Sequence, residues 1–81
     1  MQLKIITPEQ LLFEGDVDLI QVPGAKGTFE VLKNHAPIIS TLVRGKVKVK
    51  TVAGKEEFFD IPGGVIQVKQ NQIIVLTEIS I

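Results

Sequence analysis

The sequence of 81 residues contains no cysteine, tryptophan or tyrosine and only one histidine. The absence of cysteine excludes disulfides, thiolate metal sites and a cysteine nucleophile, and it fits a reducing compartment. The apolar runs are only a few residues long, far below the ~20 residues that span a bilayer, and no apolar core of signal-peptide length follows the N-terminus. We therefore expect a cytoplasmic chain that does not insert directly into a membrane.

A net charge of either sign is also lacking, because 9 basic residues balance 9 acidic ones. No net field attracts nucleic acid or an anionic membrane surface. Lys46, Lys48 and Lys50 form a short basic row that is typical of a solvated strand face, and the phenylalanines do not interleave with it to stack bases. We expect no nucleic-acid partner, and an oligonucleotide-binding barrel is disfavoured.

Groups that could converge for catalysis are few. His35 is the only side chain that titrates near neutral pH without perturbation, and Ser40 follows it closely. Asp16, Asp18 and Asp60 could complete a triad, but no nucleophile elbow accompanies them. One histidine and scattered carboxylates match neither a zinc spacing nor a calcium loop. We expect no catalytic residue, no metal site and no bound cofactor.

Glycine and proline mark turns along the whole chain. The segment Pro23-Gly24-Ala25-Lys26-Gly27 is not followed by the Ser/Thr and helix of a phosphate-binding loop, so it is predicted to be a turn. The pair Gly63-Gly64 precedes a strand-like run, which predicts positive φ or a bulge there.

Short segments rich in Val, Ile, Phe and Thr lie between these breaks, and none is long enough for a helix. No segment supplies the crossover helix of a parallel unit. The spacing predicts one all-β domain over residues 1–81, a sandwich or barrel of eight or nine strands. The predicted strands are Leu3–Thr7, Leu11–Glu14, Val17–Val22, Gly27–Leu32, Ile38–Val43, Gly45–Val52, Lys55–Ile61, Val65–Lys69 and Ile73–Glu78.

Two hairpins are predicted in the second half of the chain. In Gly45–Val52 valines alternate with lysines, and the turn at Ala53-Gly54 leads into Lys55–Ile61. Phe58 lies out of phase with Phe59 and is expected to be exposed. Val65–Lys69 and Ile73–Glu78 flank Gln70-Asn71-Gln72 and form the second predicted hairpin.

Seven motifs follow one another in an order that resembles the epsilon subunit of F-type ATP synthases over essentially the whole chain. They are Leu3-Lys4-Ile5-Ile6-Thr7-Pro8-Glu9, Phe13-Glu14-Gly15-Asp16-Val17, Val22-Pro23-Gly24, Gly27-Thr28-Phe29-Glu30-Val31-Leu32, Asn34-His35-Ala36-Pro37-Ile38-Ile39, Gly63-Gly64-Val65-Ile66-Gln67-Val68 and Asn71-Gln72-Ile73-Ile74-Val75-Leu76. The resemblance implies a sandwich of two five-stranded sheets, ten strands in all.

The resemblance also implies a role and partners. In this family the domain sits at the foot of the central stalk, at the cytoplasmic face of the energy-coupling membrane, and binds the gamma subunit and the c ring. Contact with the alpha and beta subunits is indirect. Such a subunit is not an enzyme by itself; it helps couple proton-driven rotation to ATP synthesis.

By position, the resemblance implies two interfaces. The residues that match the part facing the c ring are Gly27, Thr28, Phe29 and Glu30, and those that match the side facing gamma are Thr7, His35, Ala36, Pro37, Ile38 and Ser40. We expect surplus apolar surface at Phe29, Ile38 and Phe58, with core packing as the alternative for the first two.

This chain departs from the family pattern in two respects. The family usually carries a C-terminal helical hairpin that restrains ATP hydrolysis, whereas this sequence stops at Ile81, so an inhibitory role is not expected. Gln67 replaces a common Glu, and Lys33-Asn34 replaces the usual residues before His-Ala-Pro, so the contacts there are expected to differ.

A carrier domain is the alternative from another functional class, because lipoyl and biotinyl domains are also all-β sandwiches of about this length. They need a modified lysine at a hairpin tip. Lys55 follows Gly54 but lacks the acidic or methionine neighbour on its N-terminal side, and an ordinary turn exit explains it.

Overall fold

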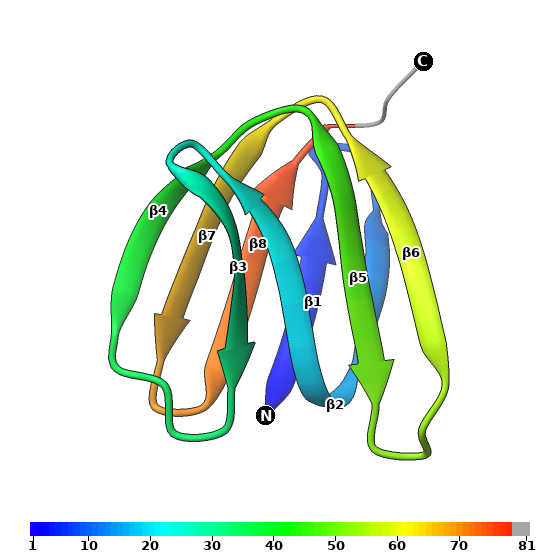
Figure 1. The fold of residues 1–81 in the computed structure, drawn as a ribbon. Helices are drawn as coiled ribbons and strands as arrows, with labels where there is room; N and C mark the ends of the chain where they lie inside the picture. Colours follow the sequence, from blue (N-terminus) through cyan, green and yellow to red (C-terminus); the bar gives the residue numbers. More distant parts are fainter. Residues whose placement is uncertain (79–81) are drawn as a thin grey trace.

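The computed structural model describes residues 1–78, so the last three residues of the predicted domain lie outside the described part. Residues 1–78 form strands and no helix (Figure 1). The strands are β1 Gln2–Ile6, β2 Leu11–Gly24, β3 Gly27–Leu32, β4 Ile38–Leu42, β5 Gly45–Thr51, β6 Glu56–Ile61, β7 Gly64–Lys69 and β8 Gln72–Thr77. The all-β prediction is confirmed.

The prediction of ten strands is wrong, since residues 1–78 form eight. The predicted segments Leu11–Glu14 and Val17–Val22 are parts of one 14-residue strand, β2. Gly15 does not interrupt it because both halves have partners: residues 11–16 pair with β1, and residues 19–24 pair with β3. A register shift against β5 between Val17 and Leu19 accommodates the bend of this long strand.

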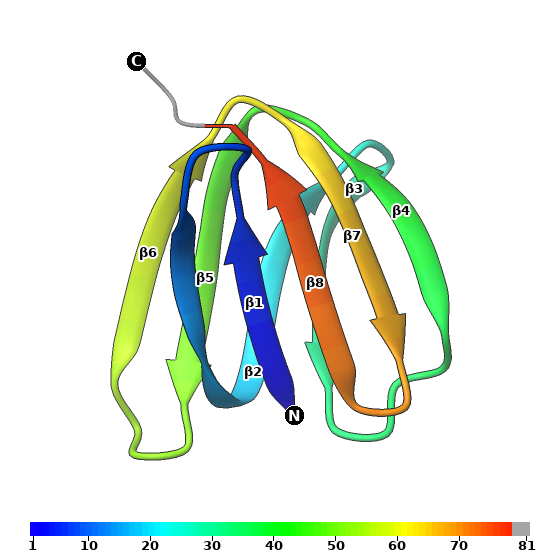
Figure 2. The same ribbon diagram turned by 180° about the vertical axis from the view of Figure 1, so that it is seen from behind.

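The strands lie in two layers that face each other (Figure 1). One layer contains β4, β7, β8, β1 and the first half of β2, and Figure 2 shows β4, β7, β8 and β1 side by side. The other contains β3, the second half of β2, β5 and β6. Because β2 belongs to both layers, hydrogen bonds join all eight strands into one sheet, not into the predicted two sheets of five strands.

The pairing of β1 with β8 is the only parallel one among the described strands. It joins the two ends of the described chain, with Leu3 opposite Ile73 and Ile5 opposite Val75. The sequence excluded parallel crossover units because no crossover helix is present. Here the intervening six strands make the connection, so none is needed.

The core lies between the layers and consists of aliphatic side chains that alternate with outward ones. The buried residues are Leu3, Ile5, Val17, Ile20, Val22, Val31, Leu42, Val47, Val49, Ile61, Ile66, Val68, Ile73 and Val75. Phe59 packs beside them. Its ring lies edge-on to that of Phe13, with the two ring centres 6.0 Å apart. Phe58 is 54% exposed, as predicted.

Both predicted hairpins are confirmed, as β5–β6 and β7–β8. Gly63 and Gly64 have φ of 148° and 153°, which confirms the predicted positive φ. A Cβ on Gly64 would collide with the carbonyl oxygen of Leu76, so this strand pair cannot form at its present spacing with any other residue there. The predicted turn within Pro23–Gly27 is found at Ala25 and Lys26, between β2 and β3.

Candidate protein-interaction surfaces

The residues predicted to face gamma are spread between the two ends of the sandwich. Thr7 follows Ile6, the last residue of β1. Ile6 pairs with Leu76 of β8, and Leu76 pairs with Val65 at the start of β7. The chain from His35 to Pro37 precedes Ile38, which pairs with Val68 near the end of β7. These residues therefore form no compact cluster, and β4 connects the two ends.

Thr7 is 4% exposed, and its hydroxyl is occupied inside a turn. Thr7 Oγ1 donates to the carbonyl oxygen of Gln10 and accepts from the Gln10 N–H, both at 3.0 Å. The Thr7 side chain therefore shapes the β1–β2 turn and offers little surface to a partner. The neighbouring Pro8 is exposed.

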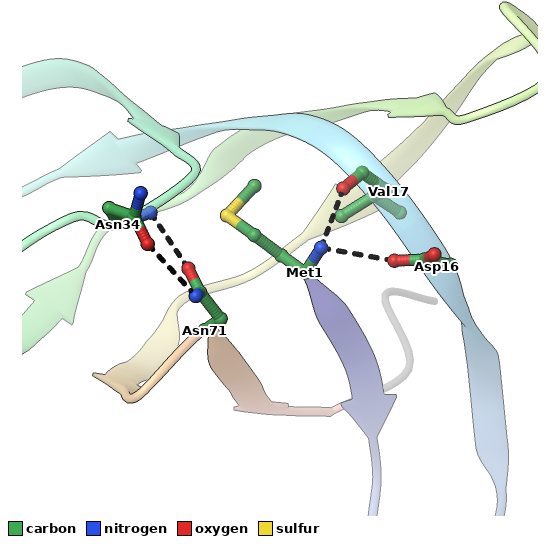
Figure 3. A network of polar contacts seen from close by, with 5 residues as sticks. All are labelled: Met1, Asp16, Val17, Asn34 and Asn71. Carbon is green, nitrogen blue, oxygen red and sulfur yellow. Dashed lines mark hydrogen bonds and ion pairs between the residues drawn. The ribbon is translucent and has the colours of Figure 1, made fainter.

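The loop that contains His35 is tied to the β7–β8 turn by two asparagines (Figure 3). The Asn34 N–H donates to Asn71 Oδ1 at 2.7 Å, and Asn71 Nδ2 donates to Asn34 Oδ1 at 3.1 Å. In the same region, the Met1 amino group lies 3.0 Å from Asp16 Oδ1 and donates to the Val17 carbonyl oxygen at 3.2 Å (Figure 3). His35 Nδ1 lies 2.7 Å from the carbonyl oxygen of Ala36. The loop is held in place while Ala36 and Pro37 remain exposed.

Strand β4 shows which isoleucine points outward. Ile38 is partly buried and packs against the core, whereas Ile39 is 75% exposed. Ser40 is partly buried on the same side of the strand as Ile38. The expected surplus apolar surface at Ile38 is therefore found one residue later.

The residues predicted to face the c ring form the tip of the β2–β3 hairpin and the start of β3. Gly27, Thr28 and Glu30 are exposed. Phe29 is partly buried against the core, so core packing, the alternative, holds for this residue. Phe29 also lines a pocket of about 380 Å³ together with Ser40, so one residue of each predicted interface borders the same pocket.

No catalytic arrangement is seen among residues 1–78. No hydrogen bond or ion pair there joins His35 to Ser40 or to an aspartate, and Ser40 Oγ donates weakly to the Thr41 carbonyl oxygen at 3.4 Å. The described residues hold no group of three His, Cys, Asp or Glu side chains that could bind a metal ion. Within the same range no helix is long and apolar enough to cross a membrane.

An apolar surface that the sequence analysis did not single out occupies one end of the outer side of one layer. The rest of that side is polar, with the Lys4–Glu14 ion pair, Lys69 and Gln72 exposed. Cross-strand registers align Val65, Leu76, Ile6 and Leu11 in one row over four adjacent strands. Ile39 and Ile74 lie in the next row, on either side of Gln67. We call these six side chains, Ile6, Leu11, Ile39, Val65, Ile74 and Leu76, the apolar face. Figure 2 views the layer that carries it.

The apolar face continues into an open pocket of about 610 Å³ at the end of the sandwich. Ile6 and Leu76 belong to both, and Pro8 and Pro62 add further apolar lining. Gly63 and Gly64 also line this pocket. A signal was present in the sequence: Ile74 and Leu76 are apolar in the phase opposite to the buried Ile73 and Val75.

The outer side of the other layer is charged over β5 and β6. We call the outward side chains of β5 and β6 the charged face: Lys46, Lys48, Lys50, Glu56, Phe58 and Asp60. Lys46 Nζ lies 3.8 Å from Asp60 Oδ1 and 5.8 Å from the centre of the Phe58 ring. Lys48 Nζ lies 3.9 Å from Glu56 Oε2. The cations and carboxylates of this face largely satisfy one another.

A β-sandwich with one apolar outer face and one self-paired charged face is typical of a protein-interaction domain. The chain belongs to the ATP synthase Delta/Epsilon chain family, whose β-sandwich domain matches residues 1–81. Because this match spans the whole chain, the carrier-domain alternative is not supported.

Curated relatives named ATP synthase epsilon chain align with nearly all of the chain. The protein of Caulobacter vibrioides is 45% identical over 78 residues, which are 96% of this chain and 90% of that protein. The protein of Chlorobaculum tepidum is 42% identical over 76 residues, or 94% of this chain and 86% of that protein. The protein of Leptospira interrogans is 36% identical, and the alignment covers only 61% of it.

Solved structures share the fold. A chain in the mitochondrial ATP synthase of Euglena gracilis, described as OSCP/F1/c-ring, aligns with a TM-score of 0.87 and 22% identity over 93% of this chain and 48% of that chain. A chain in the central stalk/c-ring of the Tetrahymena thermophila enzyme aligns with a TM-score of 0.80 and 18% identity over 96% of this chain and 63% of that chain.

Proposed function

We propose that this chain is a non-catalytic central-stalk subunit of a rotary F-type ATP synthase, bound to gamma and to the c ring. It acts at the cytoplasmic face of the energy-coupling membrane and helps couple proton-driven rotation to ATP synthesis. The names of the relatives and the assemblies that contain the similar structures support this role. Contact with the alpha and beta subunits is indirect.

The apolar face carries the proposal for gamma. It spans about 14 Å across four strands, at about 4.8 Å per strand, and it lies in a chain without net charge. Exposed apolar rows of this kind mark the centre of a protein interface. Burying the exposed half of a leucine side chain contributes on the order of 1 kcal/mol. Burial of several such side chains therefore offsets part of the entropy that association costs.

The residues predicted from the family resemblance surround this face. Ile38 and Ser40 share β4 with Ile39, and Thr7 follows Ile6. His35, Ala36 and Pro37 lead into β4 at the other end. We assign gamma contact to the apolar face, with Ala36 and Pro37 at its margin, and we assign supporting positions to Thr7, His35, Ile38 and Ser40.

The c-ring contact is assigned to the β2–β3 tip. Gly27 and Thr28 are exposed at the start of β3, and Glu30 is exposed further along the same strand. Phe29 anchors the tip to the core. The tip lies at the end of the sandwich that also contains Leu42, because Gly24 pairs with that residue.

A charge placed on the apolar face tests this assignment. Leu76→Glu should lower the affinity for the purified gamma-containing assembly by about 100-fold, because a buried unpaired carboxylate costs several kcal/mol. Phe58→Glu on the charged face is the matched control, since Phe58 and Leu76 are 54% and 51% exposed. The control should change the affinity less than about threefold. An equal loss for both variants, with both domains folded, would contradict the assignment.

A further inference from the structure

The β2–β3 and β4–β5 turns form one corner of the molecule (Figure 1). The Val43 N–H donates to the Pro23 carbonyl oxygen at 2.9 Å, and the Ala25 N–H donates to the Thr41 carbonyl oxygen at 3.1 Å. Gly45 packs closely against Pro23, because a Cβ added to Gly45 would lie only 2.8 Å from the Cβ of Pro23. The two turns therefore present a single rigid surface.

The two turns of this corner carry positive charge, and the first carboxylate beyond them is that of the exposed Glu30 on β3. Residues 22–29 and 38–45 contain no aspartate or glutamate, but they include Lys26 and Arg44. Both side chains are exposed, and neither forms an ion pair within residues 1–78. Lys4, Lys46 and Lys48, in contrast, each lie within 4 Å of a carboxylate. We call Lys26, Arg44 and the two turns the basic corner.

A pocket distinguishes Lys26 from the other lysines that have no ion pair. Its volume is about 380 Å³, and its lining includes Lys26, Phe29 and Ser40. The aromatic ring of Phe29 approaches Gly24 so closely that a Cβ there would lie 2.7 Å from a ring carbon. The polar side chains around this cavity are one cation and two hydroxyls, from Ser40 and Thr41. Such a cavity is suited to a carboxylate on an extended side chain.

We propose that the basic corner docks an acidic protein segment, with one carboxylate in the pocket beside Lys26 and another opposite Arg44. This inference rests on the proposed function, because the β2–β3 tip is the part assigned to the c ring. It specifies the chemistry of that partner surface: the loops of the ring that meet this subunit carry Asp or Glu. Opposite charges brought together in this way raise the association rate and fix the orientation of docking.

Charge reversal in the full-length chain tests the pairing. The chain is added back to synthase from which it has been stripped, and its affinity is measured at low and high salt. Lys26→Glu with Arg44→Glu should lower the affinity at least 30-fold at about 50 mM salt. The loss should shrink to less than threefold at 1 M salt, where the Debye length is only about 3 Å.

The matched control reverses two charges elsewhere. Lys33 and Lys55 are exposed and also have no ion pair within the described residues. They lie in the β3–β4 and β5–β6 connections, at the other end of the strands. Lys33→Glu with Lys55→Glu should change the affinity less than twofold. An equal loss in this control would show that only overall charge matters and would overturn the proposal.

A zero-length carbodiimide provides an independent readout, since it joins a lysine amine to a touching carboxylate with loss of water. Lys26 should be coupled to an Asp or Glu of a c-subunit peptide, identified by mass spectrometry. Absence of that product in an assembly that binds the chain would overturn the inference.

The outcomes separate the inference from the function on which it rests. If the unmodified chain failed to bind the stripped synthase, the proposed function would be wrong. If the charge-reversed chain bound normally, only the proposal of an acidic partner segment would be wrong. Protein-free vesicles with about 30% anionic lipid distinguish the other source of negative charge. If charge reversal abolished vesicle binding but left binding to the synthase unchanged, a lipid surface would replace the acidic protein segment.

Discussion

The apolar face and the charged face are built by the same alternation of inward and outward side chains, but their outward residues differ. On the charged face Lys46 pairs with Asp60, and Lys48 pairs with Glu56. On the apolar face Leu76 is flanked by Val65 and Ile6 in the same cross-strand row. Both arrangements leave the inward residues aliphatic and buried. Folding therefore constrains the inner side of each layer, and the outer sides are free to differ according to what they meet.

The largest expected effect is a difference in stability between two glycine-to-alanine substitutions, one in each layer. Gly64→Ala should lower the free energy of unfolding by about 3–4 kcal/mol, because the new Cβ collides with the Leu76 carbonyl group and φ is 153°. Gly54→Ala in the β5–β6 turn is the control, since φ is 87° but nothing lies within 4 Å of the added atom. It should cost about 1 kcal/mol. Urea denaturation measures both, and equal costs would show that the collision is relieved by movement of β8.

The second effect contrasts the two isoleucines of β4. Ile38→Glu should destabilise the isolated domain by about 2 kcal/mol, because Ile38 packs against the core. Ile39→Glu should change stability by less than about 0.5 kcal/mol, because this side chain is mostly exposed. Thermal unfolding of the two variants is the measurement. If Ile39→Glu were the more damaging, the orientation of β4 assigned above would be incorrect.

The third effect concerns the asparagine contact that joins the β3–β4 loop to the β7–β8 turn. Asn71→Gly keeps the positive φ of 59° but removes both hydrogen bonds to Asn34, and we expect a loss of about 1 kcal/mol. Gln70→Gly in the same turn removes no bond and relieves a φ of 52°, so a gain of up to about 1 kcal/mol is expected. Denaturant midpoints should move in opposite directions. A shift of the same sign would mean that the contact with Asn34 contributes little.

The smallest effect lies on the charged face. Lys46 and Asp60 are well exposed, so their ion pair should contribute no more than about 0.5 kcal/mol. A double-mutant cycle with Lys46→Ala and Asp60→Ala measures the coupling. The coupling should vanish at high salt. A value above 1 kcal/mol would make this face a significant source of stability and weaken the contrast with the apolar face.

Much of the architecture was predictable because strand periodicity is local. The alternation in Gly45–Val52 identified the buried Val47 and Val49, and both hairpins were located from their turn residues. The glycines at 63 and 64 were assigned correctly to positive φ. The single strand across Gly15 was missed, because its continuity depends on partners that come from β1 and β3.

The candidate surfaces were predictable only in part. Phe58 was correctly expected to be exposed, since its hairpin partner has an unambiguous alternation. Ile38 and Ile39 are chemically alike, so the sequence could not decide which of them points outward. The apolar row crosses two pairs of consecutive strands, β1–β2 and β7–β8, that come from opposite ends of the chain, and no local pattern shows that β1 and β8 are neighbours.

The sequence by itself determined the all-β class, most strand positions, the two hairpins and the membership that its ordered motifs indicated, because these depend on residues close together in the chain. The tertiary structure alone decided the parallel pairing of β1 with β8, the apolar face and the pocket beside Lys26. These features depend on register between distant strands. A shift of one residue in a strand exchanges its inner and outer side chains, so packing of the core sets what each face presents.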